Sequence, residues 1–149
     1  YLFIILYIAV IIIDKLIDRI KTNGTILKYP TTLKKFKFSN QKFESIKLEK
    51  NNLVVANFSL PYCNKNNFKE LWNKIDESIL KDGYFAGNFF GDNDEWKNKK
   101  DGMTFLTKEQ VMELFKDYEI IDFKEVEKDG TTALGKEKHW HIFNIIAKK

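Results

Sequence analysis

Two histidines near the end of the chain, His139 and His141, are the side chains best suited to proton transfer or metal binding. They are two residues apart, so in a strand they would point to the same face of a sheet. A metal site needs further ligands, and the chain has one cysteine, Cys63, and no third histidine, so we predict no metal site. The near-neutral pKa of histidine suits a general base or a substrate contact. A structural pair is the alternative.

A second group of candidate residues follows an apolar run at residues 53–58 (LVVANF). Asn57, Phe58 and Ser59 stand at the end of this run, which has the composition of a central strand. Open α/β sheets bind ligands beyond the carboxyl ends of their strands, so a site is expected here. Ordinary turn chemistry before Pro61 is the alternative for the two polar residues.

Asn88, Phe90 and Trp96 follow the next strand-like run, so they are candidates for lining the same pocket. Aromatic walls exclude water and attract a positively charged group through cation–π contacts. Core packing is the alternative for Phe89 and Phe90, because adjacent strand residues point to opposite faces and one of the two should point inward.

The composition describes one globular domain. The chain has 149 residues, 44% of them hydrophobic, which is enough to bury a core and argues against a disordered or fibrous protein. A net charge of +4 is modest beside that of dedicated nucleic-acid binders. The single cysteine favours a reducing, cytoplasmic setting. The apolar run 1–13 is too short to span a bilayer and lacks the features of a signal peptide, so we expect a buried strand; the end of a membrane helix is the alternative.

Hydrophobic patterning predicts the elements of the first half of the chain. Residues 4–13 suit a strand buried on both faces, 14–21 a short helix, and 26–29 a second short strand. After the central strand 53–58, a helix should begin at Asn66 or Asn67, with Glu70 completing a capping box for Asn67. The apolar residues at helical spacing are Phe68, Leu71, Trp72, Ile75, Ile79 and Leu80. Residues 81–83 should end this helix, with Gly83 as a left-handed cap.

The second half of the chain alternates in the same way. Residues 84–90 form the next predicted strand, the polar loop 91–102 follows, and a helix capped by Thr107 and Gln110 comes after it. Residues 119–127 and 140–147 read as strands, and the dipeptide Asp129-Gly130 predicts the hairpin turn between them. The order predicts an α/β fold: a Rossmann-like, mostly parallel sheet with helices on both faces and a C-terminal antiparallel hairpin.

Short segments resemble a known family of enzymes. The sequence LKDGYF at 80–85 resembles the Leu-Lys-Pro-Gly-Gly turn of class I S-adenosylmethionine-dependent methyltransferases, with Asp82 in place of the proline. The segments 57–63 (NFSLPYC), 87–91 (GNFFG) and 135–141 (GKEKHWH) resemble a bacterial subgroup often labelled tellurite-resistance-like methyltransferases. The resemblance covers residues 14–149 and implies methyl transfer from S-adenosylmethionine to a small acceptor, with no nucleic-acid or membrane partner.

The resemblance also implies roles for individual residues. Asp14 would accept hydrogen bonds from the ribose of the cofactor, although an aspartate interacting with a helix dipole is an equal alternative. Thr32 and Leu33 would contact the adenine, and Asn57 and Phe58 the methionine portion. The residues expected to contact the methyl acceptor are Ser59, Asn88, Phe90, Trp96, His139 and His141.

One feature of the family is missing. Class I methyltransferases carry a glycine-rich turn after their first strand, and the seven glycines of this chain, at 24, 83, 87, 91, 102, 130 and 135, form no such motif. Glycines 83, 87 and 91 are four residues apart, which in a strand indicates close backbone packing rather than a phosphate-binding loop. If residues 1–13 are the second strand of the family, the chain is N-terminally truncated and should transfer methyl groups weakly or not at all.

Two other functions remain as alternatives. A non-catalytic methyltransferase remnant would keep the fold and bind the cofactor poorly. A small basic nucleic-acid-binding module would use Lys34, Lys35 and Lys37 interleaved with Phe36 and Phe38. The same alternation also suits an amphipathic strand, which we prefer.

Overall fold

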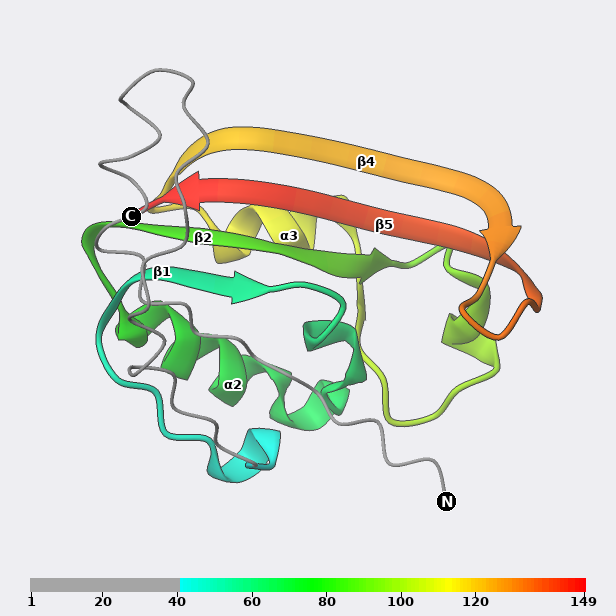
Figure 1. Cartoon of the computed structure of the whole chain (residues 1–149), viewed down its shortest axis with the longest axis horizontal. Coiled ribbons are helices and arrows are strands. Elements are labelled where there is room, and N and C mark those ends of the chain that lie inside the picture. Colours follow the sequence, from blue (N-terminus) through cyan, green and yellow to red (C-terminus); the bar gives the residue numbers. More distant parts are fainter. Residues whose placement is uncertain (1–40) are drawn as a thin grey trace, which may run out of the picture.

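A five-stranded mixed sheet organises the computed structural model, which describes residues 41–149 (Figure 1). The order of the main strands is β1-β2-β5-β4, and β3 pairs with β2. The bounds are β1 Asn51–Ala56, β2 Ile79–Gly91, β3 Phe105–Leu106, β4 Glu119–Thr131 and β5 Glu137–Lys148. The elements expected within residues 4–29 lie outside the described residues.

The pairing directions follow from how the chain connects the strands. β1 and β2 are parallel and are joined through helix α2 (Lys65–Ser78), whereas β4 and β5 form an antiparallel hairpin. β5 also runs antiparallel to β2, with Asn88 opposite Asn144 and Phe89 opposite Phe143. The predicted α/β class and C-terminal antiparallel hairpin are therefore confirmed.

The start of α2 differs from its prediction. Asn64 caps the helix, and its side-chain oxygen accepts a hydrogen bond from the backbone N–H of Asn66 at 2.9 Å. The predicted cap at Asn66 or Asn67 is therefore wrong by two or three residues, and Glu70 instead forms an ion pair with Lys74. Several neighbouring asparagines can each satisfy a helix N-terminus, so the local sequence did not determine which of them would.

The end of α2 was also predicted too late. The helix ends at Ser78, and Ile79 and Leu80, which we expected on its apolar face, begin β2. The left-handed residue of this junction is Asp82, with φ 62°, and not Gly83. Gly83 is needed for another reason: a Cβ there would lie 2.8 Å from the carbonyl oxygen of Leu80.

Helix α3 (Lys108–Leu114) begins as predicted. The Thr107 side chain accepts a hydrogen bond from the backbone N–H of Gln110, and the Gln110 side chain accepts one from the N–H of Thr107. This reciprocal capping box satisfies two N–H groups that the first helical turn cannot. Val111 and Phe115 are buried on its inner side.

The predicted hairpin turn at Asp129-Gly130 is wrong. Both residues lie within β4, opposite His139 and Lys138. The chain reverses instead in the loop 132–136, through hydrogen bonds of Thr132 with Gly135 and Lys136 and a left-handed Gly135 at φ 73°. Cross-strand pairing of the long strands overrides the local turn preference.

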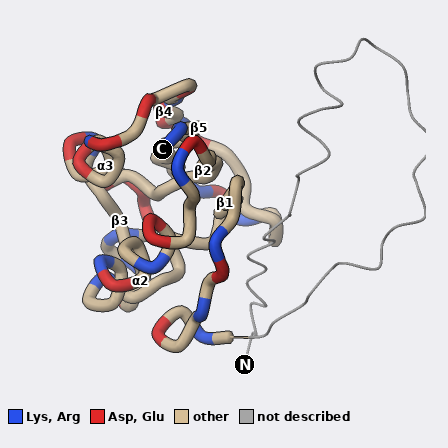
Figure 2. Tube along the Cα trace, turned by 90° about the vertical axis from the view of Figure 1, so that its left-hand side faces the viewer, with Lys and Arg blue, Asp and Glu red and all other residues tan. Residues whose placement is uncertain are grey.

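Both described α-helices pack on one face of the sheet. Trp72 of α2 and Phe115 of α3 have ring centroids 4.9 Å apart, and both rings contact Phe85 of β2. This core also takes Phe89, Phe143, Ile145 and Ala147 from the sheet. Among the described residues, no α-helix covers the opposite face, and no helix is long and apolar enough to cross a membrane. Along the described trace, acidic and basic residues intermix (Figure 2).

Candidate functional site at the carboxyl ends of β1 and β2

The parallel strands β1 and β2 end at the same edge of the sheet (Figure 1). A hydrogen-bonded asparagine pair joins the segments that follow them. The Asn88 side-chain oxygen accepts a hydrogen bond from the backbone N–H of Phe58 at 2.8 Å. The Asn88 amide nitrogen donates to the side-chain oxygen of Asn57, also at 2.8 Å. The structure thus brings together three residues that the sequence analysis selected from two separate strands.

Phe58 has an unusual backbone at this edge. Its φ is 47°, a left-handed conformation that bulky non-glycine residues rarely adopt. The bond to Asn88 holds this conformation, and the Phe58 ring stays 45% exposed. Strained backbones that the surrounding structure maintains cluster at functional sites.

Ser59 follows in the same loop and is 1% exposed. It precedes the short helix η3 (Leu60–Tyr62), but its side chain makes no cap hydrogen bond. Its hydroxyl is the single buried side-chain polar atom within residues 41–149 that has no hydrogen-bond partner. An unpaired buried hydroxyl costs free energy, so it is a candidate for contact with a bound molecule.

Aromatic residues surround this edge. We name Phe58, Tyr62, Phe90, Trp96, Phe105 and Trp140 the edge aromatic cluster, because successive rings lie 5.7–6.5 Å apart. Phe90 stands at its centre, is 1% exposed and lies outside the main core. Phe90, which we expected to line the pocket, is therefore buried beneath the other rings of the cluster. Trp96 and Trp140 are only partly buried.

A buried ion pair lies against this cluster. Lys138 Nζ and Asp94 Oδ2 are 2.5 Å apart, and neither side chain is more than 1% exposed. The Lys138 ammonium lies 3.6 Å from the Trp140 ring centroid and 4.4 Å from that of Trp96. Burial lowers the pKa of Lys138, and the hydrogen bond to Asp94 opposes this shift.

Sequence reasoning missed Asp94, Lys138 and Trp140. Asp94 could have been recognised as a helix cap, because aspartate is a preferred residue at that position. It caps the short helix η4 (Glu95–Asn98) by accepting a hydrogen bond from the N–H of Trp96. Nothing in the local sequence indicates that Lys138 and Trp140 belong to the site, because their burial depends on a loop more than 40 residues away in the sequence.

His139 and His141 lie on the other face of the sheet. The His141 ring packs 4.7 Å from Phe143, a core residue, whereas Asn88 points to the opposite face. The two histidines do share a face, as predicted, because the Glu127 carboxylate lies within 4 Å of both rings. The structure therefore separates these histidines from the asparagine pair, with which the sequence analysis had grouped them as acceptor contacts.

Both ring nitrogens of His139 form hydrogen bonds with carboxylates. Its Nδ1 lies 2.7 Å from Asp129 and its Nε2 3.3 Å from Glu127, and these hydrogen bonds raise the pKa of His139. With a carboxylate at each ring nitrogen, His139 has no ring nitrogen free to accept a proton from a substrate, so it is a poor general base.

His141 belongs to a group of possible metal ligands with Glu125 and Glu127, whose donor atoms lie within 4.8 Å of one another. The backbone N–H of Asn93 donates to His141 Nδ1 at 3.1 Å, so in the neutral ring the proton is on Nε2. Nε2 then donates to Glu125 at 3.1 Å and has no lone pair for a metal. The hydrogen bonds to His141 and then Lys108 lower the pKa of Glu125.

Cys63, the third metal ligand considered from the sequence, is fully buried in the main core. Burial is the largest of the effects that raise the pKa of its thiol to about 11. This thiol is a packing group at neutral pH and not a ligand.

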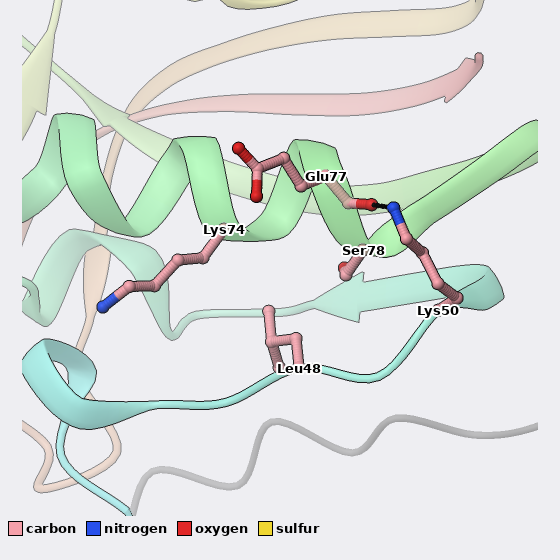
Figure 3. Close-up of a pocket in the computed structure, with 5 residues that line it drawn as sticks. All are labelled: Leu48, Lys50, Lys74, Glu77 and Ser78. Carbon is pink, nitrogen blue, oxygen red and sulfur yellow. Dashed lines mark hydrogen bonds between the residues drawn. The ribbon is translucent and has the colours of Figure 1, made fainter.

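Two cavities lie away from the asparagine pair. A small one of about 150 Å³ sits between residues 48–50 and the end of α2, where Lys50 donates to the Glu77 carbonyl oxygen at 2.6 Å (Figure 3). Lys50 thereby satisfies a helix C-terminus, which is a structural role. A larger, open cavity of about 790 Å³ is lined by Glu95, Asp129, Gly130, Thr131, Glu137, Lys138 and His139.

Three predicted cofactor residues, Asp14, Thr32 and Leu33, lie outside the described residues. The part of the site that the structure describes therefore consists of Asn57, Phe58, Ser59 and Asn88, together with the edge aromatic cluster.

No protein-family profile and no curated protein matches this sequence. Solved structures do share its fold. TehB from Haemophilus influenzae aligns with a TM-score of 0.62 and 14% identity, over 74% of this chain and 40% of its own. A SAM-dependent methyltransferase from Methanosarcina mazei aligns with a TM-score of 0.52 and 17% identity, over 73% and 65% of the two chains.

A third structure is the 1,6-didemethyltoxoflavin-N1-methyltransferase of Burkholderia thailandensis, with bound 1,6-didemethyltoxoflavin and S-adenosylhomocysteine. Its TM-score is 0.51 and its identity 15%, over 76% of this chain and 50% of that one. The chain thus spans between 40% and 65% of the length of these three proteins. Its strands and helices have the Rossmann-like α/β fold of the S-adenosylmethionine-dependent methyltransferases.

Proposed function

We propose that this chain binds S-adenosylmethionine and transfers its methyl group to a small acceptor at the carboxyl ends of β1 and β2. The observation that carries the proposal is the hydrogen-bonded set of Asn57, Phe58 and Asn88, on a fold shared with methyltransferases. Ligands of open α/β sheets bind at this position because strand ends and loops converge there.

The described residues fit the amino-acid end of such a cofactor. Asn57 uses its side-chain oxygen to accept from Asn88, so its amide nitrogen can donate to a carboxylate. Ser59 adds the buried, unpaired hydroxyl in the same loop. The proposed contacts to the ribose and adenine fall to Asp14, Thr32 and Leu33, outside the described residues.

When bound, the cofactor supplies an electrophilic methyl group on a sulfonium ion. The protein's contribution is to hold the acceptor in line and to exclude water, which can supply much of the rate enhancement. Phe58, Trp96 and Trp140 are the rings placed to exclude water here. We assign no catalytic base, because carboxylates and a backbone N–H engage the ring nitrogens of His139 and His141.

The nature of the acceptor is part of the proposal. The Burkholderia methyltransferase was solved with a small organic molecule and S-adenosylhomocysteine bound, which supports a small-molecule acceptor rather than a nucleic acid. The resemblance of residues 57–63 and 87–91 to the tellurite-resistance-like subgroup supports the same size class. A cytoplasmic location accords with the single cysteine.

The test is calorimetric titration of the purified chain with S-adenosylhomocysteine, which needs no knowledge of the acceptor. We expect saturable binding that weakens about tenfold in Asn57→Ala, because a lost hydrogen bond to a charged group costs about 1.5 kcal/mol. Asn73→Ala, which removes an exposed asparagine of α2, is the matched control and should bind like the wild type.

Asn88→Leu tests the second asparagine. It removes both hydrogen bonds that hold the Phe58 segment, so binding should fall further than in Asn57→Ala. Circular dichroism must establish that the variant is folded, since Asn88 is buried. No heat of binding from folded wild-type protein would contradict the proposal and favour the non-catalytic remnant.

A further inference from the structure

The edge aromatic cluster has a buried central ring and a solvent-exposed ring at its rim. Its central ring, Phe90, is buried, whereas Phe58 is 45% exposed and contacts Phe90 and Trp140 edge-on at 6.2 and 6.4 Å. A ring that only filled space would gain by full burial, since burying apolar area is favourable. Phe58 instead stays at the rim, next to buried Ser59 and Leu60.

The backbone maintains this exposure at a cost. A left-handed φ of 47° is unfavourable for phenylalanine, and one bond from Asn88 holds it in place. The Asn88 side chain is thus a specific hydrogen-bond partner for this strained backbone. The ring itself contacts Phe90 and Trp140, so both the backbone and the side chain of Phe58 have specific partners.

The charge inside the cluster is already neutralised. The Lys138 ammonium contacts the rings of Phe90, Trp96 and Trp140, but Asp94 pairs with it at 2.5 Å and both side chains are inaccessible. Lys100, which solvent reaches, lies over Trp96 at 4.9 Å. An oxyanion would therefore have Lys100, at Trp96, as its exposed cation, whereas beside Phe58 an uncharged ring finds the aromatic edges and faces of Phe90 and Trp140.

We infer that the methyl acceptor is a planar aromatic or heteroaromatic molecule, which packs its ring against Phe58 and Trp140. This inference rests on the proposed function, because it names the substrate class of the same site. Aromatic rings interact through quadrupoles that favour edge-to-face and offset contacts. An aromatic acceptor therefore gains a contact with these rings that a saturated molecule of the same size does not.

The test compares 2-naphthol with its saturated counterpart, decahydro-2-naphthol, on the full chain. Nuclear magnetic resonance of the indole N–H groups reads the site directly, because Trp96 and Trp140 belong to the cluster and Trp72 lies in the main core as an internal control. We expect 2-naphthol to shift the Trp140 signal and leave Trp72 unchanged. Decahydro-2-naphthol should bind roughly 3- to 10-fold more weakly, because it cannot make the ring–ring interaction that adds to the burial of apolar area.

Two variants separate ring chemistry from apolar volume. Phe58→Leu keeps an apolar side chain without a ring, and should weaken 2-naphthol roughly 3- to 10-fold while leaving decahydro-2-naphthol unchanged. Ile121→Ala removes an exposed apolar side chain of β4 and should change neither ligand. Equal binding of the two naphthols, or wild-type binding by Phe58→Leu, would overturn the inference.

A tellurite titration on the same sample gives the competing outcome. Saturable shifts of the Trp140 indole by tellurite, with none by 2-naphthol, would assign the site to an oxyanion and overturn the aromatic class. Calorimetry with S-adenosylhomocysteine keeps the two proposals apart. Cofactor binding without 2-naphthol binding would refute only the acceptor class, and 2-naphthol binding without cofactor binding would refute the proposed function.

Discussion

The tertiary structure leaves no room for a side chain at Gly91. This glycine ends β2, and a Cβ at this position would lie 2.1 Å from Nδ1 of the His141 ring. At Gly87 a Cβ would lie 2.7 Å from the Ala56 carbonyl oxygen of the neighbouring strand. The interpretation of the four-residue glycine spacing as close packing is thus confirmed.

Gly91→Ala should therefore destabilise the protein through steric overlap with His141. We expect the free energy of unfolding in urea to fall by about 1–3 kcal/mol, the usual cost of overpacking. The matched background is His141→Ala, in which the same Gly91→Ala change should cost little because the opposing ring is gone. Equal costs in the two backgrounds would show that the ring is not the cause.

Among the elements, the β4–β5 hairpin carries a cluster of charged side chains. Glu125, Glu127 and Asp129 of β4 face His141 and His139 of β5 on the same face of the sheet. Asn93, from the loop after β2, also donates to Glu127. The two strands are therefore joined by side-chain contacts in addition to their backbone ladder.

Hairpin stability should depend on pH through His139. Because its folded-state pKa is raised, its contribution is fully present below the ordinary histidine value of about 6.5 and is lost as pH rises through the folded value. Urea unfolding from pH 5.5 to 9 should show stability declining above about pH 6.5. His139→Gln should flatten this decline, and an unchanged slope in that variant would rule His139 out as its source.

The elements also show where local sequence was sufficient. The Thr107–Gln110 capping box was predicted correctly, and the predicted strands 84–90 and 140–147 lie within β2 and β5, because capping and hydrophobic patterns act over a few residues. The Asp129-Gly130 turn and the end of α2 were predicted wrongly. Both errors arise where pairing between strands outweighed a local turn or helix preference.

For the molecule as a whole, Asp94 ties the loop after β2 to β5. Its carboxylate accepts hydrogen bonds from the Lys138 ammonium, the Trp96 N–H and the His141 N–H. Glu95 accepts a further bond from the N–H of His139. The pairing of β2 with β5 ends at Phe90 and Ile142. Beyond that point, the two carboxylates accept hydrogen bonds from backbone N–H groups of β5. These bonds hold the Trp96 loop against the edge aromatic cluster.

Lys138→Met should destabilise the whole protein, because it leaves the Asp94 carboxylate buried without its cation. We expect a loss of about 3–5 kcal/mol in the free energy of unfolding, measured by chemical denaturation. Lys97→Met, an exposed lysine of the same loop, is the control and should change stability little. In Lys138→Met/Asp94→Asn the unpaired charge is gone, so much of the loss should be recovered; no recovery would contradict this account.

The sequence by itself determined the α/β class and most strand positions within the described residues. Those features depend on local hydrophobic patterns and on turn and capping residues, which act within about ten residues. Only the tertiary structure decided that Asn57 bonds to Asn88, that Asp94 neutralises Lys138, and that the two histidines lie on the opposite face. These outcomes depend on strand order and register, which join residues 30 to 50 positions apart and leave no local signature in the chain.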